Sequence, residues 1–347
     1  MVDLTPHNTL RLPAKAEKLV EIHSKDQAKK AFKSGVFESP HLILGLGANV
    51  LFTKDFPGSV ILTKIHGQKL IKETSDFVQI EFGAGENWDH TVRQTVDNNW
   101  SGMENMVMIP GTVGAAAVGN IAAYGQNQED IFVSLKALNL KTGKFEVFKK
   151  KDMEFTYRES LLKNKFTGQY LVTSVTYQLS KVTHLELSYH TSRHASLLPE
   201  LQKIAQKPYT IKDVSQAVIN MRSEKLPDIT KIGTAGSFFK NPLVDTSLAH
   251  TIKAKIPDLQ LYPADKLSYI DPNSSEPQVK IPAGMLLDYL GWRGKRIGDV
   301  GTYPTHALII CNFGQATGPQ VYEFSQSMKQ DVKNNFGINL DYEVVTI

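Results

Sequence analysis

The segment at residues 233–242, which reads Gly-Thr-Ala-Gly-Ser-Phe-Phe-Lys-Asn-Pro, gathers more chemically useful groups than any other stretch of the chain. The hydroxyl of Ser237 can give or take a proton, and the lysine and asparagine after it can hold an anion or a sugar. The two aromatic rings can cover a flat ligand and exclude water. The same pattern is also typical of a turn that enters a core strand, so its meaning depends on the segments that accompany it.

Other segments carry groups that could act on an anionic substrate. Arg158 lies between a tyrosine and a glutamate, where a fixed guanidinium could bind a carboxylate through two parallel hydrogen bonds. The alternative is an ordinary surface pair with the next residue. Arg222 and Lys225 lie at the end of a predicted helix, where basic residues also favour the helix dipole. Glu343 lies in an otherwise apolar terminal strand, and a carboxylate there is usually a solvated edge residue.

Two glycine-rich turns could bring backbone amides close to a ligand. Residues 45–49 read Gly-Leu-Gly-Ala-Asn, and residues 110–119 contain little side-chain bulk. A loop of the second kind can wrap a pyrophosphate with backbone N–H groups and without positive charge. Neither the lysine-bearing phosphate loop nor the G-x-G-x-x-G fingerprint is present, since Val50 occupies the place of the last glycine. Each turn alone is more typical of a tight chain reversal, whereas two in one lobe make a nucleotide site an equal alternative.

Composition and motifs argue against several classes of protein. The net charge is only +4 and the basic residues are interspersed with acidic ones, so a nucleic-acid-binding surface is not indicated. The ten histidines form no H-E-x-x-H pattern, and no metal site is predicted. No G-x-S-x-G pattern surrounds Ser237, which argues against a hydrolase. The single cysteine, Cys311, is expected to pack as a small hydrophobe, and no intrachain disulfide is possible.

The expected compartment is the cytoplasm. A single cysteine fits a reducing environment best. The N-terminus lacks a basic segment followed by an apolar one, and no apolar run approaches the ~20 residues that span a bilayer. We therefore expect neither export nor membrane insertion.

The elements that must position these groups can be read from hydrophobic periodicity. The length of 347 residues predicts two or three lobes. A helix is expected over residues 88–100, with Asn87 as its N-cap, and a last helix over 321–336, stopped by Gly337. Strands are expected at 135–140 and 145–148 around a turn, at 170–179, at 185–189 and at the C-terminus over 338–347. A domain boundary is expected near 180–184.

Together these segments resemble one family, UDP-N-acetylenolpyruvoylglucosamine reductase, the flavoenzyme of bacterial peptidoglycan precursor synthesis. The matching stretches follow the family's order and cover most of the chain: residues 45–52, 83–88, 102–105, 109–111, 120–125, 155–160, 221–228 and 236–242. An ordered set of this kind is far more specific than any single glycine motif. The segment around Tyr189 and the loop at 262–282 resemble the larger of the family's two subtypes.

The resemblance implies an α+β fold in three parts. A two-lobed FAD-binding region of the vanillyl-alcohol-oxidase (PCMH) type is expected over residues 13–183, with lobes of about 1–70 and 71–183. An α+β substrate-binding domain would follow over 184–347, with its last strand returning towards the active site. The residues implied in FAD binding are Gly45, Gly47, Ala48, Asn49, Val50, Pro110, Gly111, Thr112, Gly114, Asn120, Ala122, Tyr124 and Gly125. The pyrophosphate is expected beside 111–120 and the flavin ring near 47–50 and 122–125.

The resemblance also implies the reaction. NADPH would reduce FAD and leave, and UDP-N-acetyl-enolpyruvoylglucosamine would take its place to be reduced to UDP-N-acetylmuramate. Hydride would reach the methylene carbon of the enolpyruvyl ether, and negative charge would build up on the adjoining carbon and its carboxylate. Arg158 would stabilise that charge with Glu343 assisting, and Ser237 would be the proton donor. The residues implied in holding the diphosphate and sugar are Tyr189, Lys225 and Asn241. No protein partner, nucleic acid or membrane is expected.

The sequence departs from the family pattern at a few positions, and two other readings remain open. In the family, a proline usually comes directly before the glutamate and an arginine two residues after it, whereas this chain has Tyr342 and Val345 at these places. His306 replaces a glutamine that is frequent in the family. One alternative is an oxidase of the same flavin fold that acts on an alcohol. The other is a catalytically degenerate protein that binds flavin or nucleotide-sugar without turnover.

Overall fold

The computed structural model describes residues 1–188, 197–264 and 276–347. The first part is a small sheet in which β2, β5 and β3 run parallel and β1 adds an antiparallel edge. Its elements are β1 (Val2–Asp3), η1 (Thr5–His7), β2 (Lys15–Ile22), α1 (Lys25–Lys33), β3 (His41–Leu44), β4 (Val50–Leu51) and β5 (Phe56–Thr63). Strand β5 is almost wholly buried because it is the inner strand between β2 and β3.

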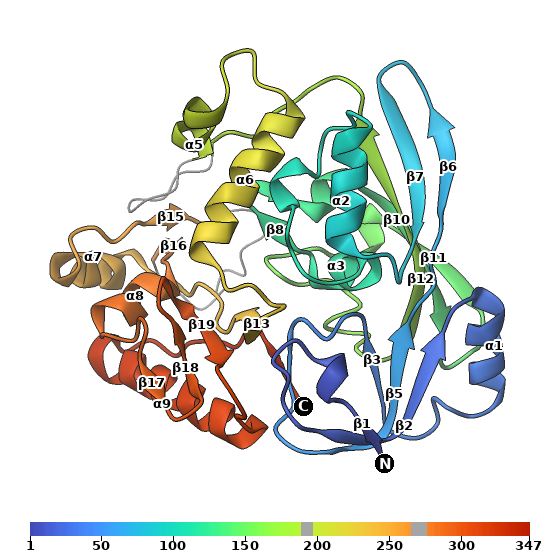
Figure 1. The fold of residues 1–347 in the computed structure, drawn as a ribbon, viewed down its shortest axis with the longest axis horizontal. Coiled ribbons are helices and arrows are strands. Elements are labelled where there is room, and N and C mark those ends of the chain that lie inside the picture. The colour runs from blue at the N-terminus through green and yellow to red at the C-terminus, as the bar shows by residue number, and fades with distance from the viewer. Residues whose placement is uncertain (189–196, 265–275) are drawn as a thin grey trace.

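The second part is a five-stranded antiparallel sheet with helices on one side (Figure 1). Its strands, in spatial order, are β11 (Phe145–Lys149), β10 (Phe132–Asn139), β12 (Tyr170–Ser180), β7 (Phe77–Gly83) and β6 (Gln68–Glu73). The remaining elements are α2 (Trp88–Asp97), η2 (Glu104–Met106), α3 (Val113–Gly119), β8 (Ala122–Ala123), β9 (Gln126–Asn127), α4 (Gln128–Ile131) and η3 (Lys150–Asp152). The predicted N-cap of α2 is confirmed, since the side chain of Asn87 accepts a hydrogen bond from the N–H of His90 at 2.9 Å.

The next two helices pack on this second part. Helices α5 (Leu197–Ile204) and α6 (Ile211–Lys225) bury their apolar residues in the same core as β7, β10 and α2. The packing therefore divides the chain after residue 225, later than the boundary expected near 184. No strand forms over residues 185–188, the described part of the strand expected at 185–189. Side chains that are distant in sequence bind the backbone in and next to this segment. Ser101 Oγ donates to the carbonyl of His184 at 3.0 Å, and Asn105 Nδ2 to that of Glu186 at 2.9 Å.

The C-terminal domain has its own core, which begins at Ala235 along its sequence. Its larger sheet has the order β13 (Gly233–Ser237), β19 (His306–Asn312), β18 (Val300–Tyr303) and β17 (Arg296–Ile297). A smaller sheet holds β14 (Leu243–Asp245), β16 (Gln278–Lys280) and β15 (Tyr262–Pro263), and the helices are α7 (Thr246–Lys255), α8 (Ala283–Tyr289) and α9 (Gly318–Phe336). As predicted, α9 ends at Gly337, which adopts φ 72°.

Both chain ends connect the first part to the C-terminal domain. Leu10 and Leu12 are fully buried in the C-terminal core. At the other end, β20 (Val345–Thr346) pairs in parallel with β4, so the predicted terminal strand is real but much shorter than 338–347. The two termini consequently lie close together at the bottom of Figure 1.

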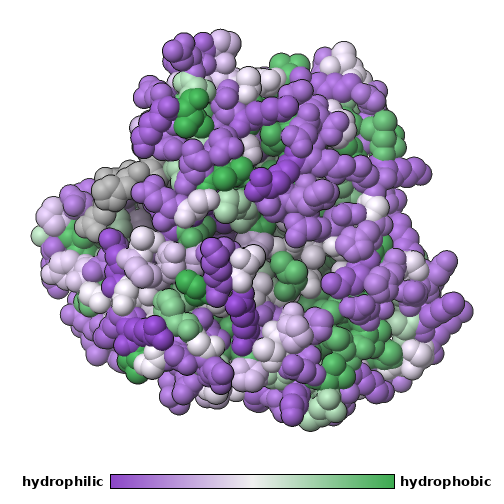
Figure 2. Space-filling model, in the orientation of Figure 1, coloured by the Kyte–Doolittle hydropathy of each residue, from purple (hydrophilic) through white to green (hydrophobic). Residues whose placement is uncertain are grey.

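The surface seen in Figure 2 is mostly hydrophilic, and apolar side chains gather in a green patch at the lower right of this face. Within the described residues, no helix has both the length and the apolar character needed to cross a bilayer.

Candidate active site

Arg158 lies at the tip of a tight hairpin in the second part of the chain. The backbones of Thr156 and Glu159 exchange two hydrogen bonds of 3.1 and 3.0 Å, which leaves Arg158 in the left-handed region at φ 60°. Its Nε donates to Glu343 Oε1 at 3.0 Å and its Nη2 to the carbonyl of Ala122 at 3.0 Å. Nη1 has no hydrogen-bond partner among the described residues, so one terminal nitrogen is available to an anionic ligand.

Ser237 lies at the end of β13, directly after a β-bulge. Between Thr234 and Ser237, β13 has one residue more than its partner β19, and Gly236 adopts φ 74° to accommodate it. Such a bulge re-aims the side chain that follows. A side chain added at Gly236 would meet nothing within 4 Å, so open space lies beside the serine. The Ser237 hydroxyl makes no hydrogen bond within the described residues, which leaves it free to act on a ligand.

Glu343 reaches this place through a bridge with the residues after Ser237. Its N–H donates to the carbonyl of Phe238 at 2.8 Å, and its carbonyl accepts from Asn49 Nδ2 at 3.1 Å. The preceding Tyr342 stacks on Phe239 with ring centroids 5.4 Å apart. Tyr342 thus holds in place the bend that carries Glu343.

The structure therefore brings together three groups that are distant in sequence. The Arg158–Glu343 pair is mostly buried, with 22% and 20% of the side chains exposed, and Ser237 lies one residue from the bridge to Glu343. A desolvated guanidinium of this kind binds a carboxylate more strongly than one in water. Sequence reasoning proposed the three residues, and the structure gives them one location.

The glycine-rich turns form the adjoining part of the site. A side chain at Gly45 would lie 2.4 Å from Thr112 Oγ1, and one at Gly47 would lie 2.0 Å from the carbonyl oxygen of His7. Gly45 is therefore required by close packing against the second turn, and Gly47 by close packing against the backbone of His7. Gly111 differs, because nothing lies within 4 Å of an added side chain there and its φ is 147°. Free space at this position lets a ligand approach the backbone of the loop.

The other predicted cofactor residues lie around the short helix α3. Thr112 is its N-cap, Gly114 lies so close to the strand below that an added side chain would come within 2.8 Å of Ala84, and Asn120 ends the helix at φ 44°. Asn120 also donates to the carbonyl of Thr156 at 2.9 Å, which ties this loop to the Arg158 hairpin. The remaining predicted positions lie on three segments: Ala48, Asn49 and Val50 on the first turn and the start of β4, Pro110 at the start of the second turn, and Ala122, Tyr124 and Gly125 at the β8–β9 hairpin.

Buried polar atoms in this region fit a polar cofactor. Asn105 Oδ1, Gln128 Oε1 and Arg222 Nε are buried and have no partner among the described residues. Arg222 does donate from Nη2 to the carbonyl of Met108 at 3.2 Å, and burial lowers its pKa although the phenol of Tyr124 opposes this. Each unpaired buried group costs ~1–3 kcal/mol, so these atoms favour a ligand with both acceptors and donors. FAD has both, and the residues present therefore fit it.

Two of the predicted substrate residues, Asn241 and Lys225, lie in the described part of the chain. The Asn241 side-chain oxygen accepts the N–H of Ala283 at 3.0 Å, so it caps α8 and leaves its amide donors for a ligand. Burial lowers the pKa of Lys225, which lies near His306. Burial also lowers the pKa of His306 to about 4, with Asp288 opposing and Lys225 contributing. Tyr189 lies outside the described residues.

Sequence reasoning missed several residues of the site. Lys163, Lys240 and Glu159 form a charged cluster behind Arg158, and Arg222 was read only as the end of a helix. The lysine of the segment 233–242 was noted as a possible anion ligand, but nothing in the sequence indicates that it contacts a glutamate 81 positions away. Only the three-dimensional arrangement reveals that contact.

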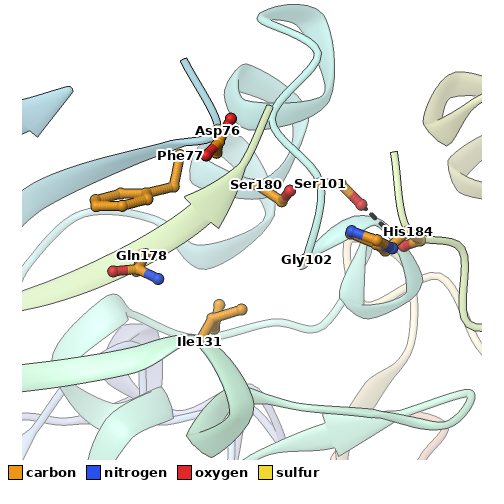
Figure 3. Close-up of a pocket in the computed structure, with 8 residues that line it drawn as sticks. All are labelled: Asp76, Phe77, Ser101, Gly102, Ile131, Gln178, Ser180 and His184. Atoms are coloured by element: carbon orange, nitrogen blue, oxygen red, sulfur yellow. Dashed lines mark hydrogen bonds between the residues drawn. The ribbon is translucent and has the colours of Figure 1, made fainter. Parts of the chain in front are cut away.

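A cavity of about 320 Å³ lies elsewhere, at one end of the second sheet (Figure 3). It is lined by Asp76, Phe77, Ser101, Gly102, Ile131, Gln178, Ser180 and His184. None of the predicted site residues contributes to it, so it is separate from the candidate active site.

Comparisons with known proteins bear on the domains of the chain and on its family. Residues 16–149 match the family model of an FAD binding domain. Residues 228–347 match the C-terminal domain of UDP-N-acetylenolpyruvoylglucosamine reductase. This second match begins close to the division that the packing indicates after residue 225. The predicted α+β fold, an FAD-binding region followed by a further domain, is confirmed.

Two curated relatives cover nearly the whole chain, and both are named UDP-N-acetylenolpyruvoylglucosamine reductase. The protein from Flavobacterium johnsoniae is 40% identical over 99% of this chain and 98% of its own. That from Pseudomonas fluorescens is 38% identical over 99% and 96%. Among solved structures, a reductase of the same name from Thermus caldophilus has a TM-score of 0.66 at 21% identity, with 100% of this chain and 97% of its own covered, and supports the fold.

Proposed function

The chain belongs to the UDP-N-acetylenolpyruvoylglucosamine reductase family, and from that premise we propose that it reduces UDP-N-acetyl-enolpyruvoylglucosamine to UDP-N-acetylmuramate with NADPH as co-substrate. It contains an FAD-binding domain, and it is an oxidoreductase of peptidoglycan precursor synthesis. When bound, FAD accepts a hydride from NADPH and supplies a hydride to the substrate. A cytoplasmic location, where NADPH is made and a single thiol stays reduced, belongs to this proposal.

Arg158 has the role of binding the substrate carboxylate. Its Nε and Nη2 are already held by Glu343 and Ala122, so the guanidinium is oriented before a ligand arrives. Nη1 then faces the carboxylate, on which negative charge builds up as a hydride adds to the neighbouring methylene carbon. A preorganised cation in a partly desolvated place stabilises that charge without reorganisation. Glu343 assists by holding the guanidinium in position.

Ser237 has the role of proton donor. As the carbon–hydrogen bond forms at the methylene carbon, the electron pair of the double bond moves to the adjoining carbon. The Ser237 O–H gives its proton to that carbon and is afterwards reprotonated from solvent. A hydroxyl is a weak acid, but it can protonate a more basic carbanion within hydrogen-bond reach. The free hydroxyl and the open space beside Gly236 support this role.

Lys225 and Asn241 have the role of holding the diphosphate and the sugar. A lysine supplies a point charge for phosphate oxygens, and the amide donors of Asn241 are not used by its cap on α8. Tyr189 is proposed for the same role on the family resemblance alone.

The single observation that carries the proposed mechanism is the meeting of Arg158, Ser237 and Glu343 beside the glycine-rich loops of the FAD-binding domain. Purified protein tests it by spectroscopy under anaerobic conditions. NADPH is expected to bleach the flavin absorption, and only the enolpyruvyl sugar nucleotide is expected to restore it. Rapid reoxidation by oxygen alone would indicate an oxidase, and a flavin that NADPH cannot reduce would indicate a binding protein. Nothing in the comparisons favours that last reading.

A further inference from the structure

The Arg158 hairpin contacts the C-terminal domain with three consecutive side chains. Tyr157, Arg158 and Glu159 belong to the FAD-binding region, yet each of them faces a charged group of the other domain. Their partners are, in the same order, Lys280 with Nζ 4.7 Å from the ring centroid, Glu343 at 3.0 Å, and Lys240 in a short ion pair. An incidental contact on a surface would involve a single pair, whereas here three consecutive residues each have a charged partner across the domain boundary.

Glu159 lies between two lysines and is largely shielded from water. Its Oε1 contacts Lys240 Nζ and lies 3.6 Å from Lys163 Nζ, and the three side chains are 18%, 23% and 19% exposed. Lys163 also donates to the carbonyl of Arg158 at 2.7 Å. Burial lowers the pKa of Lys163, Glu159 and Glu343 oppose this, and Lys240 adds to the lowering. Charges this shielded are worth more, and cost more to break, than an exposed pair.

Lys240 connects this cluster to the strand that carries the proton donor. It lies three residues after Ser237, and its N–H donates to the carbonyl of Asp341 at 2.9 Å. Two residues before Lys240, the carbonyl of Phe238 accepts the N–H of Glu343 at 2.8 Å. Ser237 and Glu343 therefore lie on one hydrogen-bonded unit, and the contact from Lys240 to Glu159 joins the Arg158 hairpin to that unit.

We propose that Glu159, Lys163 and Lys240 form a clamp that sets the position of the Arg158 guanidinium relative to Ser237 and Glu343. Arg158 needs such support because the left-handed conformation brings the Cβ of a residue other than glycine too close to the backbone. The clamp also affects the charge of the site. The cations Arg158, Lys163 and Lys240 and the carboxylates Glu159 and Glu343 leave one positive charge over (three minus two) for the substrate carboxylate. The clamp residues are positioning residues, and this role depends on the proposed reductase function.

The variant that tests the clamp is Lys240→Met, measured in the two half-reactions separately. Reduction of the flavin by NADPH is expected to remain unchanged, because within the described residues no hydrogen bond or ion pair joins Glu159, Lys163 or Lys240 to the glycine-rich turns. Reoxidation by the enolpyruvyl sugar nucleotide is expected to slow ~10–100-fold, the usual effect of a misplaced catalytic group. Lys240→Arg, which keeps the charge and the reach, is expected to restore most of the rate. Equal slowing of both half-reactions would overturn the inference, as would no slowing.

A double-variant cycle separates positioning from a general loss of structure. If Lys240 acts through Arg158, Lys240→Met is expected to cause no further slowing in an Arg158→Ala background. Fully additive losses would contradict the clamp. Lys165→Met is the matched control, since it removes an exposed ion pair with Glu154 from the same loop and is expected to change neither half-reaction.

Two further measurements, on wild-type protein and on a crystal structure, distinguish a failure of the proposed function from a failure of the clamp. Failure of the sugar nucleotide to reoxidise wild-type protein would count against the function and not against the clamp. A crystal structure of Lys240→Met shows whether the clamp holds Arg158 in place, and it does not depend on turnover. In that variant the contact of 3.0 Å between Arg158 Nε and Glu343 Oε1 is expected to be lost. A hairpin that keeps this contact and its φ of 60° would overturn the clamp.

Discussion

At the scale of single residues, the guanidinium of Arg158 performs two tasks at once. Two of its nitrogens donate to Glu343 and Ala122 at 3.0 Å each, while the third has no hydrogen-bond partner among the described residues. An ammonium has no planar fork, so Arg158→Lys cannot keep both internal contacts and also bind a carboxylate. We expect this variant to slow reoxidation by the sugar nucleotide ~100-fold or more, as measured by anaerobic stopped flow. Arg93→Lys, in an exposed pair with Asp89, is the control, and equal rates in the two variants would contradict the role of Arg158.

His306 makes the stability of the fold depend on pH. Burial lowers its pKa from 6.5 to about 4, so between these values the unfolded chain binds a proton that the folded chain does not. Stability is therefore expected to fall as the pH falls through this window. His306→Gln removes the titrating group, and the unfolding midpoint of the variant should drop less than that of wild type between pH 7 and pH 5. Equal drops in both proteins would show that His306 does not titrate in this way.

The resemblance to a family proposed the three central groups, but not their surroundings. Residue types alone left open that Ser237 lies in an ordinary turn, that Arg158 forms a surface pair and that Glu343 is a solvated edge residue. Lys163 and Lys240 were not given this role, because the value of a lysine here depends on burial and on Glu159, which are tertiary properties.

At the scale of elements, helix α8 depends on a predicted substrate residue. The side-chain oxygen of Asn241 accepts the N–H of Ala283, the first residue of the helix. The amide nitrogen of Asn241 takes no part in this cap. Asn241→Asp keeps the acceptor and loses the donors, whereas Asn241→Ala loses both. Both variants should raise KM for the sugar nucleotide ~10-fold or more, and only Asn241→Ala should also lower the free energy of unfolding by about 1 kcal/mol. Denaturant unfolding and steady-state kinetics check this, and an aspartate variant as unstable as the alanine variant would contradict it.

Helices with clear periodicity and caps were the easiest elements to predict. The N-cap at Asn87 and the stop at Gly337 both follow from local hydrogen bonding, which the sequence encodes directly. The bulge before Ser237 could not be predicted, because it depends on the register with β19. The strand expected at 185–189 is absent from its described part, 185–188, where Asn105 binds the carbonyl of Glu186 from far away in sequence.

At the scale of the whole molecule, the last residues link the C-terminal domain to the FAD-binding region. The N–H of Val345 donates to the carbonyl of Asn49 at 3.1 Å, next to the contact from Asn49 to Glu343. Val345→Pro removes this donor, whereas Val345→Ala keeps it. We expect the proline variant alone to bind FAD more weakly and to reoxidise about 10-fold more slowly, because it releases Asn49 and Glu343 together. Cofactor titration by fluorescence and stopped flow measure the two effects, and identical behaviour of both variants would contradict the link.

The three-part architecture could be predicted only from the resemblance to a family. Hydrophobic periodicity predicts strands and helices, but long-range pairing decides which sheet each strand joins. Helices α5 and α6 pack on the second part of the chain because their apolar residues are buried in its core. The return of the C-terminus to β4 is likewise a property of the folded molecule.

The most direct test of the account is a comparison of wild-type protein with Ser237→Ala in the two anaerobic half-reactions. We expect NADPH to bleach the flavin of both proteins at the same rate. The enolpyruvyl sugar nucleotide should then restore the colour of the wild type, and should restore that of the variant ~100-fold more slowly or worse, because the proton donor is missing. If the variant is reoxidised as fast as the wild type, or if both half-reactions fail together, Ser237 is not the proton donor and the proposed mechanism is wrong.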